Sequence, residues 1–124
     1  MVLFDKFIEI KPRPYPHISF KNGYAYTPQW YKEYKQQIQY LVTRNFQIGC
    51  TPIYCPIYAV ELKFSLATAK YTSRNAGDVD NLAKAVLDAL TGIIWDDDGK
   101  VTQLVVSKYP ALKNGIYIYV QGFN

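Results

Sequence analysis

The feature that most constrains the fold is a long segment of alternating character at residues 57–71. Its larger apolar side chains fall on every second position: Tyr58, Val60, Leu62, Phe64 and Leu66. An alternation of period two is typical of a strand with one buried face. The sequence therefore predicts a long strand over residues 57–71, and the apolar face of that strand needs a second layer to cover it.

Two segments have the helical spacing that could supply this second layer. The first opens at Thr27-Pro28 and runs to about Phe46, because Thr is a good N-cap and Pro suits the first helical position. The second starts at Asp78, which could cap it, and ends near Gly92. Apolar residues three or four apart predict one buried stripe on each helix. The stripes are Trp30, Tyr34, Ile38 and Leu41 in the first helix, and Val79, Leu82, Ala83, Val86 and Leu90 in the second.

The remaining segments complete a sheet. Residues 7–10, 101–109 and 115–123 read as strands, with a turn around residues 113–115. Three prolines within residues 11–16 predict a stiff, extended segment, and residues 17–26 suit a small hairpin or a loop. We therefore expect an α+β fold, as one domain over residues 1–124, with two main helices packed on a single mixed β-sheet.

Composition narrows the class of protein. There is no apolar run of about 18 residues, so we expect no transmembrane helix and no membrane partner. The first residues lack the apolar stretch of a signal peptide. Two cysteines, Cys50 and Cys55, cannot form a disulfide framework, and the single histidine, His17, excludes schemes that need two. These features indicate a reduced, cytoplasmic protein.

Charge is distributed unevenly along the chain. Residues 1–75 hold ten Lys/Arg and four acidic residues, whereas residues 76–124 hold four Lys and six Asp. A basic surface around a compact acidic cluster suits a polyanion that must meet a metal ion. Uneven surface charge without a function remains the alternative interpretation.

The acidic residues form two groups. Asp78 and Asp80 lie at the start of the second predicted helix, and the triplet 96–98 follows that helix. We expect the chain to reverse at Gly92 and return alongside the helix, placing Asp98 near Asp80. Three carboxylates without a His or Cys partner favour Mg²⁺ or Mn²⁺ and suggest phosphodiester hydrolysis. Taken alone, an acidic triplet of this kind would be interpreted as a solvated loop, and it gains meaning only if it meets the first pair in space.

One basic residue falls among these acids. Lys84 lies one helical turn after Asp80, where its ammonium could stabilise developing negative charge. It could also be only an i,i+4 partner of Asp80 or Asp88.

Residues 77–101 resemble the RusA family of Holliday-junction resolvases. The resemblance rests on an Asp-x-Asp-Asn opening at Asp78, a Lys four residues after the second Asp, an Asp-Ala-Leu from Asp88, and Trp-Asp-Asp-Asp-x-x-Val from Trp95. It extends more weakly to the proline-rich, basic stretch that begins at Lys11.

The resemblance implies a Mg²⁺-dependent homodimer that resolves four-way DNA junctions by paired nicks, leaving 5′-phosphate and 3′-hydroxyl ends, in recombination and repair. It implies that Asp78, Asp80 and Asp98 bind the metal ion and that Lys84 assists catalysis, with Asp97 as a second candidate for the position of Asp98. The residues expected to touch DNA are Lys11, Arg13, Lys70 and Arg74.

Other interpretations stay open at the level of sequence. The chain could be a related nuclease acting on flapped or otherwise branched DNA, because substrate choice depends on dimer geometry and DNA bending. It could also be a non-catalytic DNA-binding protein that uses the metal ion structurally. Lys11 and Arg13 could belong to a rigid connection, Arg74 could be an exposed loop residue, and Lys70 could cap a strand end.

Overall fold

The computed structural model describes residues 1–16, 19–21, 23–45, 55–67 and 77–124, and it confirms the expected α+β class. The elements, in chain order, are β1 (Val2–Ile8), β2 (Ser19–Lys21), β3 (Tyr24–Tyr26), α1 (Gln29–Thr43), β4 (Ile57–Leu66), α2 (Val79–Leu90), the 3₁₀ turn η1 (Asp98–Lys100), β5 (Val101–Pro110) and β6 (Gly115–Phe123).

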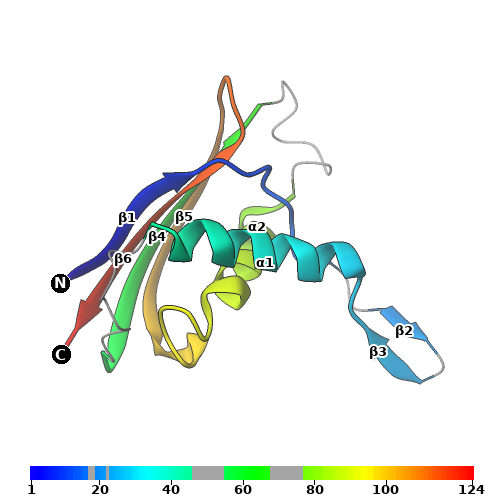
Figure 1. The fold of residues 1–124 in the computed structure, drawn as a ribbon, viewed down its shortest axis with the longest axis horizontal. Coiled ribbons are helices and arrows are strands. Elements are labelled where there is room, and N and C mark those ends of the chain that lie inside the picture. The colour runs from blue at the N-terminus through cyan, green and yellow to red at the C-terminus, as the bar shows by residue number, and fades with distance from the viewer. Residues whose placement is uncertain (17–18, 22, 46–54, 68–76) are drawn as a thin grey trace.

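Four strands form the predicted mixed sheet, in the order β1-β6-β4-β5. β6 pairs antiparallel with both β1 and β4, whereas β4 and β5 run parallel. β2 and β3 form a separate small hairpin, which confirms one of the two alternatives for this segment and projects beyond the end of α1 (Figure 1).

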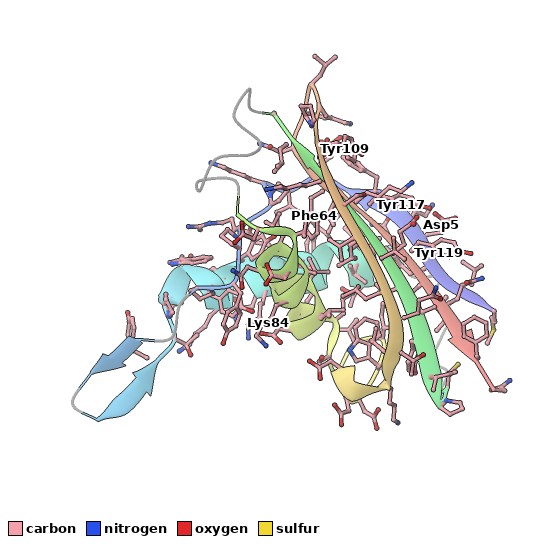
Figure 2. The ribbon with its side chains drawn as sticks, turned by 180° about the vertical axis from the view of Figure 1, so that it is seen from behind. Asp5, Phe64, Lys84, Tyr109, Tyr117 and Tyr119 are labelled. Carbon is pink, nitrogen blue, oxygen red and sulfur yellow. The ribbon has the colours of Figure 1, made fainter. Side chains whose placement is uncertain are left out.

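Both helices lie on the same face of the sheet, as the period-two pattern requires (Figure 1). The alternating side chains of β4, from Tyr58 to Leu66, are buried beneath the helices. Neither α1 nor α2 covers the opposite face of the sheet, and Asp5, Tyr117 and Tyr119 lie close together on that face in Figure 2. Neither helix in the described part of the chain has the length and hydropathy to cross a bilayer.

Several local expectations differ from the structure. β1 begins at Val2, five residues before the predicted strand, and β4 ends at Leu66, so the predicted end of that strand at residues 68–71 lies outside the described residues. Pro28, and not Thr27, occupies the N-cap position of α1. Val79 is 38 % exposed, because it lies at the first position of α2, before the helix meets the sheet.

The buried stripe of α1 is also rotated from the predicted one. Tyr34 and Ile38 are buried as expected, but Tyr31 and Val42 take the places given to Trp30 and Leu41. Both registers have spacings of three or four, so periodicity alone could not choose between them. In the folded protein, α1 packs the stripe that contains Tyr31 and Val42 against the sheet and α2.

The segment β4-α2-β5 is a parallel crossover, and this connection decides where the acidic groups lie. Two parallel strands can be joined only if the chain returns to the starting end of the sheet, and α2 makes that return. A tight turn follows, in which Gly92 has a φ of +89° and its amide donates to the carbonyl of Trp95 at 2.6 Å. β5 then runs back in the direction of β4.

Candidate active site

The first turn of α2 carries the first pair of acidic residues. Asp78 is in the N-cap position of α2, but its side chain makes no capping hydrogen bond. Its carboxylate is exposed and is therefore available to a ligand. Asp80 is also exposed, and its Oδ1 accepts a hydrogen bond from the amide of Asn81 at 2.9 Å. Both carboxylates lie near the positive end of the helix dipole and can accept a cation.

The proline-rich segment holds this turn in place. Gly77 has a φ of +84°, and a Cβ there would lie 2.9 Å from the Cβ of Pro14, so the close approach requires glycine. The amide of Tyr15 donates to the carbonyl of Asn81 at 2.9 Å. As predicted, residues 11–16 form neither helix nor strand, and they contact the segment that carries Asp78 and Asp80.

Lys84 lies on the exposed side of α2 (Figure 2), and it contacts an aromatic ring and a carboxylate. Its Nζ is 4.8 Å from the centroid of the Tyr15 ring and 4.0 Å from Oδ1 of Asp88. Asp88 is in turn oriented by Tyr31, a buried residue of α1 whose hydroxyl donates to Oδ2 at 2.7 Å. Neither Tyr15 nor Tyr31 could be predicted as a neighbour of this site, because no local spacing in the sequence connects either tyrosine to Lys84.

The buried tyrosines predict a loss of stability at high pH. Burial, and then the hydrogen bond to Asp88, raises the pKa of Tyr31 well above its ordinary range, and burial raises the pKa of Tyr34 to about 12. The folded state therefore keeps phenol protons that the unfolded chain loses near pH 10. The free energy of unfolding should be unaffected by these groups below pH 10 and fall as the pH rises above it.

Urea unfolding at pH 8 and pH 11 measures this effect. The Tyr31→Phe variant should show a pH dependence shallower by up to about 1.4 kcal/mol per pH unit. Tyr40→Phe, at an exposed position of the same helix, is the matched control and should leave the slope unchanged. An equal slope in wild type and Tyr31→Phe would contradict the prediction.

The second acidic group lies in the turn before β5. Asp96 pairs with Lys100 at 2.7 Å, and this hydrogen bond holds the pKa of Asp96 below its usual range. Asp97 caps the 3₁₀ turn, since its Oδ1 accepts from the amide of Gly99 at 2.9 Å. The Asp98 carboxylate is exposed and has no hydrogen bond or ion pair with the described residues. Of the three, Asp98 has the carboxylate most available to a ligand.

The two acidic groups do not meet within one chain, so the expected return of Asp98 to Asp80 is wrong. No three acidic, histidine or cysteine side chains among the described residues are close enough to hold a metal ion. The return beside α2 is made by β5 itself, whose Lys108 donates to the carbonyl of Gly77 at 2.8 Å. From Val101 to Lys108 the strand covers roughly 23 Å, which places Asp98 near the opposite end of the crossover.

The predicted DNA-contacting residues divide into two pairs. Lys11 and Arg13 are exposed next to α1, and the guanidinium of Arg13 stacks on the ring of Trp30 at 3.8 Å. The amide of Arg13 also donates to the hydroxyl of Tyr34 at 3.1 Å, so the backbone here is fixed. Lys70 and Arg74 lie outside the described residues.

Fold and site together define a small α+β protein whose crossover helix presents exposed oxygen donors and a lysine. The family model for the endodeoxyribonuclease RusA matches residues 8–121, nearly the entire chain. A comparison with curated proteins gave no match. The chain belongs to the RusA endodeoxyribonuclease family, whose members are endonucleases of Holliday junctions and generally depend on divalent metal ions.

Proposed function

We propose that this protein is a Mg²⁺-dependent endodeoxyribonuclease that resolves four-way DNA junctions. It acts in the cytoplasm as a homodimer, in DNA recombination and repair, and makes paired nicks that leave 5′-phosphate and 3′-hydroxyl ends. The single observation that carries the proposal is the family match over residues 8–121. The chemistry of the exposed residues Asp78, Asp80 and Lys84 on the crossover helix agrees with it.

The proposed metal ligands suit Mg²⁺ by their chemistry, but within one chain they do not lie close enough together to share an ion. Asp78 and Asp80 supply hard oxygen donors from one turn of α2, whereas Asp98 is far from both. We infer that Asp98 reaches the pair from a second copy of the chain. A dimer with two-fold symmetry then forms two equivalent sites, each using Asp78 and Asp80 of one protomer and Asp98 of the partner subunit.

A divalent ion bound there would activate water and stabilise charge on the attacked phosphate. Lys84 places a fixed ammonium one helical turn from Asp80, where it can stabilise charge that develops on the phosphate oxygens. The Tyr15 ring and the Asp88 carboxylate both contact this ammonium, and the Lys84 side chain stays half exposed.

The DNA backbone is held outside this centre by basic residues. Lys11 and Arg13 lie on the segment that also fixes the first turn of α2, so phosphate contacts there would align the duplex with the carboxylates. Lys70 and Arg74 complete the proposed set. These contacts position the nucleic acid, and junction selectivity comes from the two-fold arrangement of two sites.

Cleavage of a synthetic four-way junction tests this function. We expect symmetric nicks on the junction, with Mg²⁺ or Mn²⁺, and none with EDTA. Asp80→Asn should reduce the rate by at least about 10³-fold while junction binding is retained, because the loss of a ligand removes several kcal/mol of stabilisation.

Linear duplex and a flapped duplex are the substrate controls, and Glu33→Gln, an exposed acid on α1, is the matched variant. Preferential cleavage of the flap would replace the junction by another branched substrate. Binding without cleavage in either divalent ion would overturn the enzymatic proposal and favour a DNA-binding protein.

A further inference from the structure

A small pocket lies at the base of the β2-β3 hairpin, one helical turn beyond Lys84 along α2. The acidic residues proposed to bind the metal ion do not line it, and its volume is about 140 Å³. An apolar cavity of about 150 Å³ is enough to admit benzene, so the pocket has room for a single six-membered ring. The residues that line it include Tyr15, Tyr26, Tyr31, Lys35 and Asp88.

Aromatic rings supply much of the pocket surface. The rings of Tyr15 and Tyr31 meet edge to face, with centroids 5.3 Å apart and planes at 85°. Tyr26 is the last residue of β3 and is 52 % exposed, so a large part of its side chain is available to a ligand. Aromatic surfaces of this kind stack with nucleobases and accept any of them, because every base has a π-face.

Two groups of opposite charge also line the pocket. The Lys35 ammonium lies 4.9 Å from the centroid of the Tyr31 ring and forms no ion pair with the described residues. Oδ2 of Asp88 accepts the hydroxyl proton of Tyr31 at 2.7 Å, and the carboxylate retains further acceptor sites. The carboxylate disfavours a bare anion, and the ammonium disfavours a metal ion. A neutral ring whose edge both donates and accepts hydrogen bonds suits both groups, and a nucleobase is such a ring.

The position of the pocket along α2 relates it to the proposed reaction. Asp80, Lys84 and Asp88 follow one another at intervals of four residues, and each interval advances about 6 Å along the helix. A DNA strand whose reacting phosphate lies at Asp80 and Lys84 therefore brings a neighbouring nucleotide close to Asp88. The Tyr15 ring connects the two places, because it lines the pocket and lies 4.8 Å from Nζ of Lys84.

We propose that this pocket takes one unstacked nucleobase of branched DNA, from a nucleotide next to the reacting phosphate. The inference rests on the proposed function, because it takes the position of that phosphate from Asp80 and Lys84. A base inside a continuous duplex must first be unpaired and unstacked, whereas a base at a branch point enters at a lower cost. The pocket therefore adds a preference for branched over linear DNA to the selectivity that two symmetric sites provide.

Binding measurements on Tyr26→Ala test the pocket without requiring cleavage. By fluorescence anisotropy in EDTA, the variant should bind a four-way junction about 5- to 150-fold more weakly, which is the range for loss of one stacked base. Binding to linear duplex should be unchanged. Tyr40→Ala, at an exposed position of α1 outside the pocket, is the matched control and should bind both substrates as the wild type does. No loss on the junction, or equal losses on junction and duplex, would overturn the proposal.

Photocross-linking then locates the base. Junctions that carry 5-iodouracil or 5-iodocytosine at one nucleotide beside the branch are irradiated with the wild-type protein, and mass spectrometry identifies the cross-linked residue. We expect a cross-link to Tyr15 or Tyr26 from at least one position of the junction, and none from the same sequence in linear duplex. Cross-links confined to residues outside the pocket would also contradict the proposal.

These measurements separate the pocket from the proposed function. If the wild type cleaves junctions, and Tyr26→Ala binds and cleaves them equally well, the pocket assignment is wrong and the nuclease assignment stands. If junction binding needs Tyr26 and the cross-link forms in the pocket, but no branched DNA is cleaved with Mg²⁺ or Mn²⁺, the pocket assignment stands and the nuclease assignment fails.

Discussion

Mixed dimers of Asp80→Asn and Asp98→Asn are expected to recover cleavage that neither variant shows alone. If each site combines Asp80 of one protomer with Asp98 of the partner subunit, a mixed dimer contains one site with both changes and one intact site. Random pairing makes half of the dimers mixed, so the mixture should have about a quarter of the intact sites of wild type. Against a background reduced about 10³-fold, this is a gain of more than 100-fold.

Co-expression with two different affinity tags isolates the mixed dimer for a junction-nicking assay. It should nick one strand of each junction and not two, because only one site is intact. The matched control is the mixed dimer of Asp78→Asn and Asp80→Asn, whose two changes belong to the same half of the site. Each of its two sites is damaged, so it should stay inactive. Recovery in neither mixture would show that Asp98 does not act across the dimer.

Trp95→Ala should be the most destabilising single change in the turn that carries the acidic triplet. Trp95 is 2 % exposed, its ring centroid lies 5.6 Å from that of Tyr58, and its Nε1 donates to Oγ1 of Thr91 at 3.1 Å. Removing a buried indole of this size lowers the free energy of unfolding by about 3–5 kcal/mol. Urea unfolding followed by circular dichroism measures the change.

Trp30→Ala is the control, because Trp30 is only half-buried beneath Arg13. This substitution should lower the free energy of unfolding by about 1 kcal/mol. Since Trp95 also fixes the chain before Asp98, stable Trp95→Phe molecules should retain cleavage, whereas folded Trp95→Ala molecules should cleave more slowly. Equal losses of stability in the two alanine variants would contradict the assignment of Trp95 to the core.

Most of the fold could be predicted from local pattern. The alternation from Tyr58 to Leu66 and the spacing within α2 predict a one-sided sheet under helices, because burial of apolar surface is the dominant favourable term in folding. The register of α1 could not be predicted, since stripes through Trp30 or Tyr31 satisfy the same period. Contact with the sheet and with Asp88 on α2 selects Tyr31.

The candidate site could be predicted only in part from the sequence. The residue types at Asp78, Asp80 and Lys84 predict oxygen ligands with a cation one helical turn away. The predicted path of the chain after Gly92 was wrong, because the length of the segment permits Asp98 to return to Asp80 but does not require it. The chain does return along α2, but it does so as β5, which pairs in parallel with β4.

The α+β class, the apolar faces of the main elements and the chemistry of the acidic residues all depend on neighbours along the chain, so local sequence is enough to predict them. Pairing between distant segments places Asp78 and Asp98 at opposite ends of the crossover, brings Tyr15 and Asp88 into contact with Lys84, and leaves the outer side of β5 without a partner strand among the described residues. These arrangements depend on which strands pair and in which direction, and contacts between distant residues fix that choice.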